Sequence, residues 1–170
     1  MSSFKNFSVH SLPSIAKLEF KRIHENYLKV ILANTFFIFL LIFIALFLVI
    51  KFKLKDVIPE FTLYIYILFF LIVVVFSVVL IFGFSKRKYA IREKDISYKK
   101  GFFFKSFVTV PFSRIQHLEV DESPLSRFFK LASLSIYTAG DSSTDLEING
   151  LNREEAFQIK DYISAIINEK

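Results

Sequence analysis

The chain has 170 residues, of which 54% are hydrophobic and 23 are phenylalanine, and its formal net charge is +6. This apolar content exceeds the roughly 45–50% of ordinary soluble proteins and argues against a purely soluble protein. The absence of cysteine excludes disulfides and metal centres held by cysteine thiolates. The apolar excess divides the chain into an N-terminal segment (1–29), a membrane part (30–84) and a domain-like part (85–170).

The N-terminal segment is too charged for the apolar core of a secretory leader, so no cleaved leader is expected. Within residues 14–29, Phe20, Ile23 and Tyr27 fall on one face of a helix, and Leu18 interrupts the pattern. The sequence leaves two alternatives open: a helix lying on the cytoplasmic leaflet, or an extension of the first membrane span.

Two uncharged apolar segments follow, 21 residues long (30–50) and 24 residues long (61–84). About 20 apolar residues cross a hydrocarbon core of roughly 30 Å, so each segment predicts a transmembrane helix. The connector, 51–60, is only ten residues long and contains Pro59. The two helices are therefore expected to form a hairpin with both chain ends on one side of the membrane.

Basic residues near the spans predict the orientation. Four lysines or arginines precede the first span and seven follow the second, whereas the connector has three. This excess predicts that both termini lie in the cytoplasm, in a multi-pass protein of the cell (inner) membrane.

Neither span contains a charged residue or a histidine, which argues against a proton relay or an ion pathway. Asn34 and Thr35 lie near the start of the first span, where a hydrogen bond between helices is the simpler explanation.

From residue 89 onward the hydrophobic pattern changes to the period of two that is typical of strands. Short strands are predicted at 89–91, 96–98, 102–110, 117–121, 134–138 and 145–149, with a turn or short helix over 125–131 and a hairpin loop over 139–144. Pro111 is expected to close the third strand and Gly150 to end the last.

A single amphipathic helix is predicted after these strands. Asn152 can cap it, with Glu155 reaching back in a capping box. An apolar stripe at helical spacing follows: Ala156, Ile159, Ile163 and Ile166. Short strands followed by one helix predict an α+β domain in which the helix plugs one opening of a curled sheet.

Several motifs occur in a specific order: YAIREKDISYKKGFFF, then VPFSRIQHLEVDESPLSRFFKLASLSIYTAG, then INGLNREEAF. In order and spacing, residues 85–168 resemble the bacterial pleckstrin-homology-like domain of membrane-flanked proteins, in which two preceding spans are also typical. Phe129-Lys130 stands where many relatives have Phe-Gly. The resemblance implies a partly open β-barrel of two sheets capped by a C-terminal helix, but it does not imply phosphoinositide binding.

Two basic groups are candidate contacts for anionic lipid or another anionic ligand. The first is Lys86, Arg87 and Lys88, whose role in setting the orientation explains them fully, although each could add about 1 kcal/mol of attraction to anionic lipid. The second is Lys99, Lys100 and Lys105, with three phenylalanines between them. The resemblance places this second hairpin where eukaryotic relatives hold phosphates; the alternative is a hairpin tip with aromatic residues in the core or in the bilayer. No nucleic-acid partner is expected, because the membrane explains the basic residues.

The sequence offers no catalytic or cofactor site. His117 and Asp121 lie on the same face of a predicted strand, on the order of 13 Å apart, so with Glu119 they cannot all reach one ion. Any two of them could share a metal only if a neighbouring strand supplied more ligands, and a solvated strand face is the simpler interpretation. Ser123 has no evident base, and the four glycines are scattered. No enzyme activity, metal or cofactor is expected.

The leading functional hypothesis is therefore a non-catalytic membrane protein. It would present a PH-like domain at the cytoplasmic face for binding a protein partner or for self-association. The alternatives are an anionic-lipid-sensing module and a small transporter or channel subunit.

Overall fold

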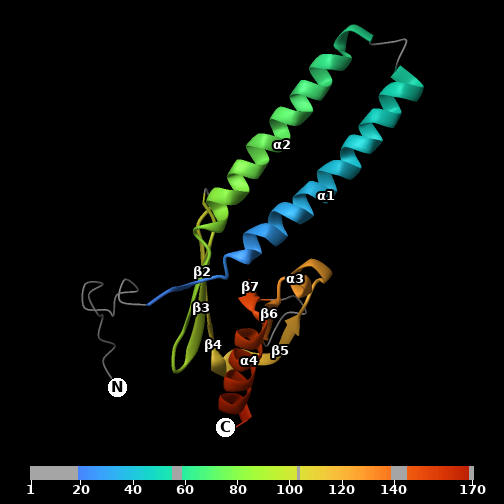
Figure 1. The fold of residues 1–170 in the computed structure, drawn as a ribbon. Coiled ribbons are helices and arrows are strands. Elements are labelled where there is room, and N and C mark those ends of the chain that lie inside the picture. The colour runs from blue at the N-terminus through green and yellow to red at the C-terminus, as the bar shows by residue number, and fades with distance from the viewer. Residues whose placement is uncertain (1–18, 55–58, 103, 139–144, 169–170) are drawn as a thin grey trace, which may run out of the picture.

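The computed structural model describes residues 19–54, 59–102, 104–138 and 145–168. Two long helices, α1 (Asn26–Val49) and α2 (Thr62–Phe84), run alongside each other away from an α+β domain (Figure 1). The domain contains a four-stranded sheet, a three-stranded sheet and the C-terminal helix α4 (Arg153–Asn168). The predicted fold class, a two-helix hairpin followed by a two-sheet domain with a C-terminal helix, is confirmed.

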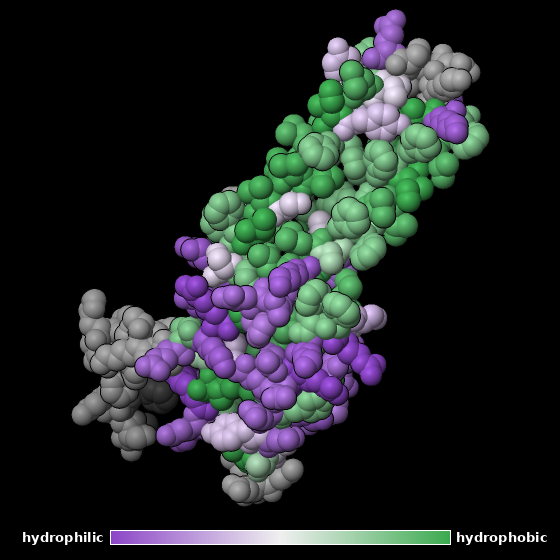
Figure 2. Space-filling view, viewed as in Figure 1, coloured by the Kyte–Doolittle hydropathy of each residue, from purple (hydrophilic) through white to green (hydrophobic). Residues whose placement is uncertain are grey.

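The two long helices expose apolar surface along their length (Figure 2). α1 continues into a π-helical segment, Ile50–Leu54, and a 3-10 turn, Pro59–Phe61, precedes α2. The stretches Asn26–Lys53 and Thr62–Phe84 are long and apolar enough to cross a membrane. Apolar side chains are compatible with the hydrocarbon core of a bilayer. A helix can also span that core because it satisfies its own backbone hydrogen bonds. The two predicted helices are confirmed, and the first begins at residue 26 rather than 30.

The first sheet is antiparallel and has the order β1 (Lys21–Arg22), β2 (Lys88–Ile91), β3 (Asp95–Lys100) and β4 (Ser106–Pro111). β4 ends at Pro111 as predicted, but it begins at Ser106 rather than at Phe102. Gly101 has a positive φ of 99°, and a Cβ there would lie 1.8 Å from the carbonyl oxygen of Phe104. The aromatic run thus belongs to the connection between β3 and β4; Phe103 lies outside the described residues.

The second sheet has the order β5 (Ile115–Asp121), β6 (Leu131–Thr138) and β7 (Leu146–Asn152). A 3-10 turn, Phe112–Arg114, joins β4 to β5, and the short helix α3 (Pro124–Phe128) lies between β5 and β6. The predicted hairpin loop, 139–144, lies outside the described residues.

The prediction that Gly150 ends the last strand is wrong. β7 continues through Gly150, which has a φ of 84°, and the pairing with β6 shifts register at this level. Glycine tolerates this conformation, so it forms a bulge within the strand instead of a break.

Helix α4 packs its apolar stripe against the second sheet. Ala156, Ile159 and Ile163 are buried, and Ile166 packs against the core, as predicted. Asn152 accepts a hydrogen bond from the backbone amide of Glu154, whereas Glu155 does not close the predicted capping box. Its carboxylate instead accepts hydrogen bonds from the Tyr89 hydroxyl and the Lys21 ammonium.

The described part of the N-terminal segment also differs from the prediction. Over residues 19–25 the backbone is not the predicted helix: Lys21–Arg22 forms β1, beside β2, and helix α1 starts at Asn26. Residues 14–18 of the predicted helix lie outside the described residues. Ile23 is buried in the domain core, and the backbone amide of His24 donates to the Gly150 carbonyl at 2.9 Å. The segment therefore bridges the first sheet and the second sheet directly before α1.

Candidate functional site

The connection between β3 and β4 lies beside the end of helix α2 (Figure 1). The ring of Phe102 is 5.7 Å from the ring of Phe82, which belongs to the last turn of α2. Phe104 is 94% exposed. Because Phe82 lies inside a helix that can cross the membrane, this hairpin tip stands at the boundary between the apolar helices and the domain.

The lysines predicted as ligand contacts surround this tip. Lys99 and Lys100 end β3, and Lys105 precedes β4; all three are exposed. The structure thus brings the second basic group together with two aromatic side chains. The two versions of the hairpin hypothesis, an anionic patch and aromatic insertion, concern the same few residues.

The first basic group is divided between two places. Lys86 is exposed in the turn after α2, whereas the guanidinium of Arg87 lies over the ring of Tyr27, 5.8 Å from its centroid. Lys88 is the first residue of β2 and stands directly opposite Lys99 on β3.

A row of cations crosses the first sheet at this level. Arg22 of β1 is the direct partner of Lys88, which in turn is the direct partner of Lys99. Such partners share one face of the sheet, with Cβ atoms about 4.5–5.5 Å apart, and like charges placed there are destabilising. A bound anion would relieve this repulsion.

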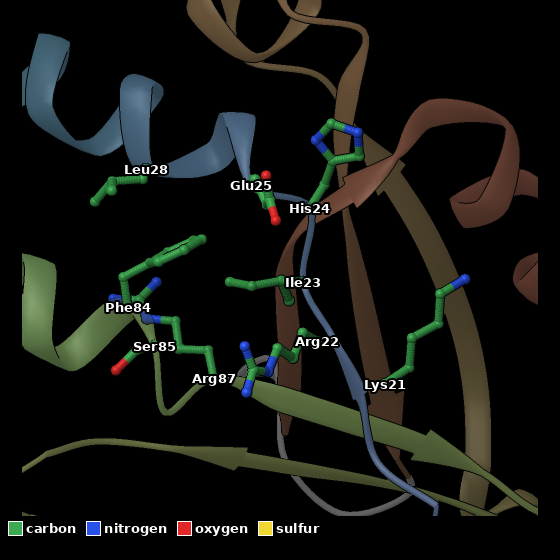
Figure 3. Close-up of a pocket in the computed structure, with 9 residues that line it drawn as sticks. All are labelled: Lys21, Arg22, Ile23, His24, Glu25, Leu28, Phe84, Ser85 and Arg87. Carbon is green, nitrogen blue, oxygen red and sulfur yellow. The ribbon is translucent and has the colours of Figure 1, made fainter.

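A cleft lies where the N-terminal segment, α1 and α2 meet. We call it the boundary cleft; it has a volume of about 630 Å³ and is lined by Lys21, Arg22, Ile23, His24, Glu25, Leu28, Phe84, Ser85 and Arg87. In Figure 3, Leu28 of α1 and Glu25, the N-cap of α1, lie on one side of the cleft. Arg22, Ser85 and Arg87 lie on the opposite side. Of these residues, the sequence indicated only Arg87 as a candidate ligand contact. The others could not be assigned to this place, because the pairing of β1 with β2 joins segments more than 60 residues apart.

Two tyrosines, Tyr89 of β2 and Tyr98 of β3, are on the buried face of the first sheet, and both have raised pKa values. Burial raises the pKa of Tyr89, and its hydrogen bond to Glu155 raises the pKa further. Burial likewise raises the pKa of Tyr98, while the nearby Arg87 guanidinium opposes that rise.

The helix α3 carries a second exposed phenylalanine on the domain. This helix lies near α1, and Phe128 is 80% exposed beside the exposed Arg127. The domain therefore presents exposed phenylalanines next to both long helices: the hairpin tip beside α2 and Phe128 beside α1. No pattern in the sequence marks Phe128.

The acidic and histidine side chains of β5 form no metal site. His117 and Glu119 are exposed and 2.9 Å apart, and the Tyr137 hydroxyl donates to Glu119 at 3.0 Å. The hydrogen bond from His117, then that from Tyr137, lowers the pKa of Glu119. Among the described residues, no group of three histidine, cysteine, aspartate or glutamate side chains could hold a metal ion.

The serine considered as a nucleophile has a structural role. Ser123 caps α3: its Oγ accepts a hydrogen bond from the backbone amide of Ser126 and donates to the Ser126 hydroxyl.

Comparison with known proteins identifies the family. The model of the bacterial PH domain family matches residues 28–167, and the chain belongs to this family. The matched range takes in both long helices and so extends beyond the 85–168 resemblance in the motifs.

A curated relative is the UPF0699 transmembrane protein YdbS of Bacillus subtilis (strain 168). It is 34% identical over 79 residues, which are 46% of this chain and 48% of that protein. The chain thus spans about half the length of this relative. Together with the two apolar helices, the relative identifies a membrane protein with a PH-like domain. No solved structure matches the chain.

Proposed function

We propose that the protein is a non-catalytic membrane protein whose PH-like domain is held against the cytoplasmic leaflet and senses anionic lipid there. The observation that carries this proposal is the contact between Phe102 and Phe82, which ties the lysine-flanked hairpin tip to the last turn of α2. Lipid sensing is thereby preferred to the partner binding that the sequence alone placed first.

The arrangement of side chains supports insertion of aromatic rings with basic residues at headgroup level. Phenylalanine rings can enter the boundary between headgroups and acyl chains, as they do on the apolar face of interfacial helices, and lysines beside them are attracted to anionic headgroups by about 1 kcal/mol each. Phe104 and Phe128 are exposed on the domain at the boundary with the helices. The exposed Lys99, Lys100 and Lys105 lie close enough to the hairpin tip to contact headgroups when its rings enter the interface.

The cytoplasmic orientation is part of the proposal. It is supported by the excess of basic residues at the domain end of the helices over the connector end. The cytoplasmic leaflet is also the one that carries a negative surface potential.

Hydrogen exchange of the full chain in lipid nanodiscs tests this function. When neutral lipid is partly replaced by anionic lipid, we expect slower exchange in peptides covering residues 99–106, because the tip becomes buried at the interface. The Lys99→Ala/Lys100→Ala/Lys105→Ala variant should lose most of this protection, whereas Lys51→Ala/Lys53→Ala, at the opposite end of the helices, should keep it. Exchange that is the same in neutral and anionic discs would contradict the proposal.

A protein partner is the second candidate function. Within the described residues, β4 is the last strand of its sheet, and Phe107 on it is 41% exposed. Such an edge can accept a strand from a partner or from a second copy. Cross-linking through β4 in native membranes, lost when Thr109 is replaced by proline, would favour this function over lipid sensing.

A further inference from the structure

Two cavities follow one another along the same face of α1. Leu28 lines the boundary cleft, and Leu32, one turn further along, lines a second cavity of about 240 Å³ between the helices. We call this second cavity the interhelical groove; it is lined by Leu32, Thr35, Phe36, Phe39, Leu40, Phe43, Phe69, Phe70, Val73 and Ser77. The i, i+4 spacing of Leu28, Leu32 and Phe36 places them on a continuous strip of the helix surface.

The polarity along this strip changes where the membrane boundary lies. The boundary cleft carries the cations Lys21, Arg22 and Arg87, whereas the interhelical groove is apolar apart from two hydroxyls. One of these, Ser77, donates to the Val73 carbonyl at 2.8 Å and so has a partner within its own helix. From Leu32 to Phe43 the groove extends about 16 Å along α1, close to the thickness of one hydrocarbon leaflet, about 15 Å.

Two arginines of the cleft have no acidic partner. Lys21 is paired with Glu155, but among the described residues no carboxylate lies within 4 Å of the Arg22 or Arg87 side chain. The Tyr27 ring holds Arg87 in place. A guanidinium binds phosphate through two parallel hydrogen bonds, and this is the ligand chemistry that arginine suits best.

Glu25 is the one acid of the lining, and its side chain makes no capping hydrogen bond to α1. Its carboxylate can accept a hydrogen bond from an ammonium or free hydroxyl group carried by the alcohol that is esterified to the lipid phosphate. Phosphate, headgroup donor and acyl chain thus each have a complementary part of the lining: the arginines, Glu25 and the apolar groove.

We propose that one glycerophospholipid occupies the boundary cleft and the interhelical groove, with its phosphate at Arg22 and Arg87 and an acyl chain along the seam between α1 and α2. The inference deepens the proposed function and rests on it for the position of the domain against the bilayer. It uses residues other than those of the hairpin tip, so the two can fail separately.

Native mass spectrometry of the full chain purified in mild detergent tests the site. We expect one retained phospholipid per protein, with at least tenfold lower occupancy in Arg22→Gln/Arg87→Gln. The lipid should remain in Lys51→Gln/Lys53→Gln and in the Lys99→Ala/Lys100→Ala/Lys105→Ala variant. Millimolar inorganic phosphate should not displace it, since the acyl chain contributes to binding.

Three results would overturn the site: a wild-type protein that retains no lipid, equal occupancy in the double arginine variant, or displacement by phosphate alone. If lipid is lost only from the hairpin variant, the site proposed here is wrong while the proposed function stands.

A second measurement uses the unaltered protein and does not depend on how the arginine variants fold. A phospholipid with a photoactivatable group on its acyl chain, incorporated in nanodiscs, should label the half-buried groove residues Leu32 and Phe39. Ile38 and Leu41, which are exposed and do not line the groove, serve as internal controls. Labelling that is equal on both sets would contradict the proposal.

Discussion

Replacing Ile23 with alanine is expected to destabilise the domain by about 2–4 kcal/mol, because a buried isoleucine is lost from a core that cannot fully collapse around the cavity. Ile23 is only 4% exposed and belongs to the same core cluster as the buried residues of both sheets. For a domain of this size the change corresponds to a fall of about 10 °C or more in melting temperature. Circular dichroism of the full chain in detergent measures it.

Ile44→Ala is the matched control. Ile44 lies in α1 and is 45% exposed, so its truncation should leave the unfolding of the domain almost unchanged. A melting temperature for Ile23→Ala within error of the wild-type value would mean that the N-terminal segment is not part of the domain core. The same reasoning implies that a fragment starting at residue 85 lacks a core residue and one strand, and so is unsuitable as an isolated domain.

Replacing Gly150 with valine is expected to destabilise the domain by about 3 kcal/mol or more, from two separate causes. The φ of 84° is unfavourable for a β-branched residue, a strain of order 1–3 kcal/mol. In addition, a Cβ at this position would lie 2.3 Å from Cγ of the Tyr27 ring, which must then move. Because Tyr27 is in the first turn of α1, the substitution should loosen the attachment of the domain to the membrane helix.

A double-mutant cycle isolates the contact with the ring. In the background of Tyr27→Ala, Gly150→Ala should lose the clash with the ring atoms but keep the backbone strain and the 2.7 Å approach to the Cβ of residue 27, which gives a coupling energy of about 1 kcal/mol or more. Gly83→Ala is the control, since a Cβ at that position would have no atom within 4 Å beyond its own helix backbone and chain neighbours. Chemical denaturation monitored by circular dichroism measures all of these proteins; additive effects at Gly150 and Tyr27 would refute the close packing.

Local sequence patterns predicted the elements whose signals repeat along the chain. The two apolar runs gave the long helices, and the stripe containing Ala156, Ile159 and Ile163 gave the buried face of α4. The alternation around Ile96 and Leu134 predicted strands, and Pro111 marked a strand end correctly. In each case neighbouring residues carry the information.

The misassigned elements depend on contacts between distant residues. Two-residue β1 is too short to show a period, and its partner β2 begins more than 60 residues later, so the segment around Ile23 resembled a helical face. Gly150 has its conformation because β7 must bulge beneath Tyr27, which no turn motif reveals. Glu155 pairs with Tyr89 across the domain instead of capping its own helix.

The candidate site was predicted only in part for the same reason. Lys99, Lys100 and Lys105 stood out because they cluster in sequence, and in the structure they flank one hairpin. Arg22 could be assigned to the boundary only once β1 was placed beside β2, and Phe128 only once α3 was placed against α1. The cleft forms where residues 21–28 and 84–87 come together, which local sequence patterns do not indicate.

The depth of Phe104 in the bilayer is the most direct test of a domain that contacts anionic lipid. The chain contains no tryptophan, so Phe104→Trp introduces a single tryptophan at a position of the hairpin tip that is 94% exposed. In proteoliposomes with anionic lipid, brominated acyl chains should quench it strongly, with a blue-shifted emission, whereas Phe157→Trp on α4 should be neither quenched nor shifted. Emission at Phe104→Trp that is unquenched and typical of water, with or without anionic lipid, would contradict membrane contact by the domain.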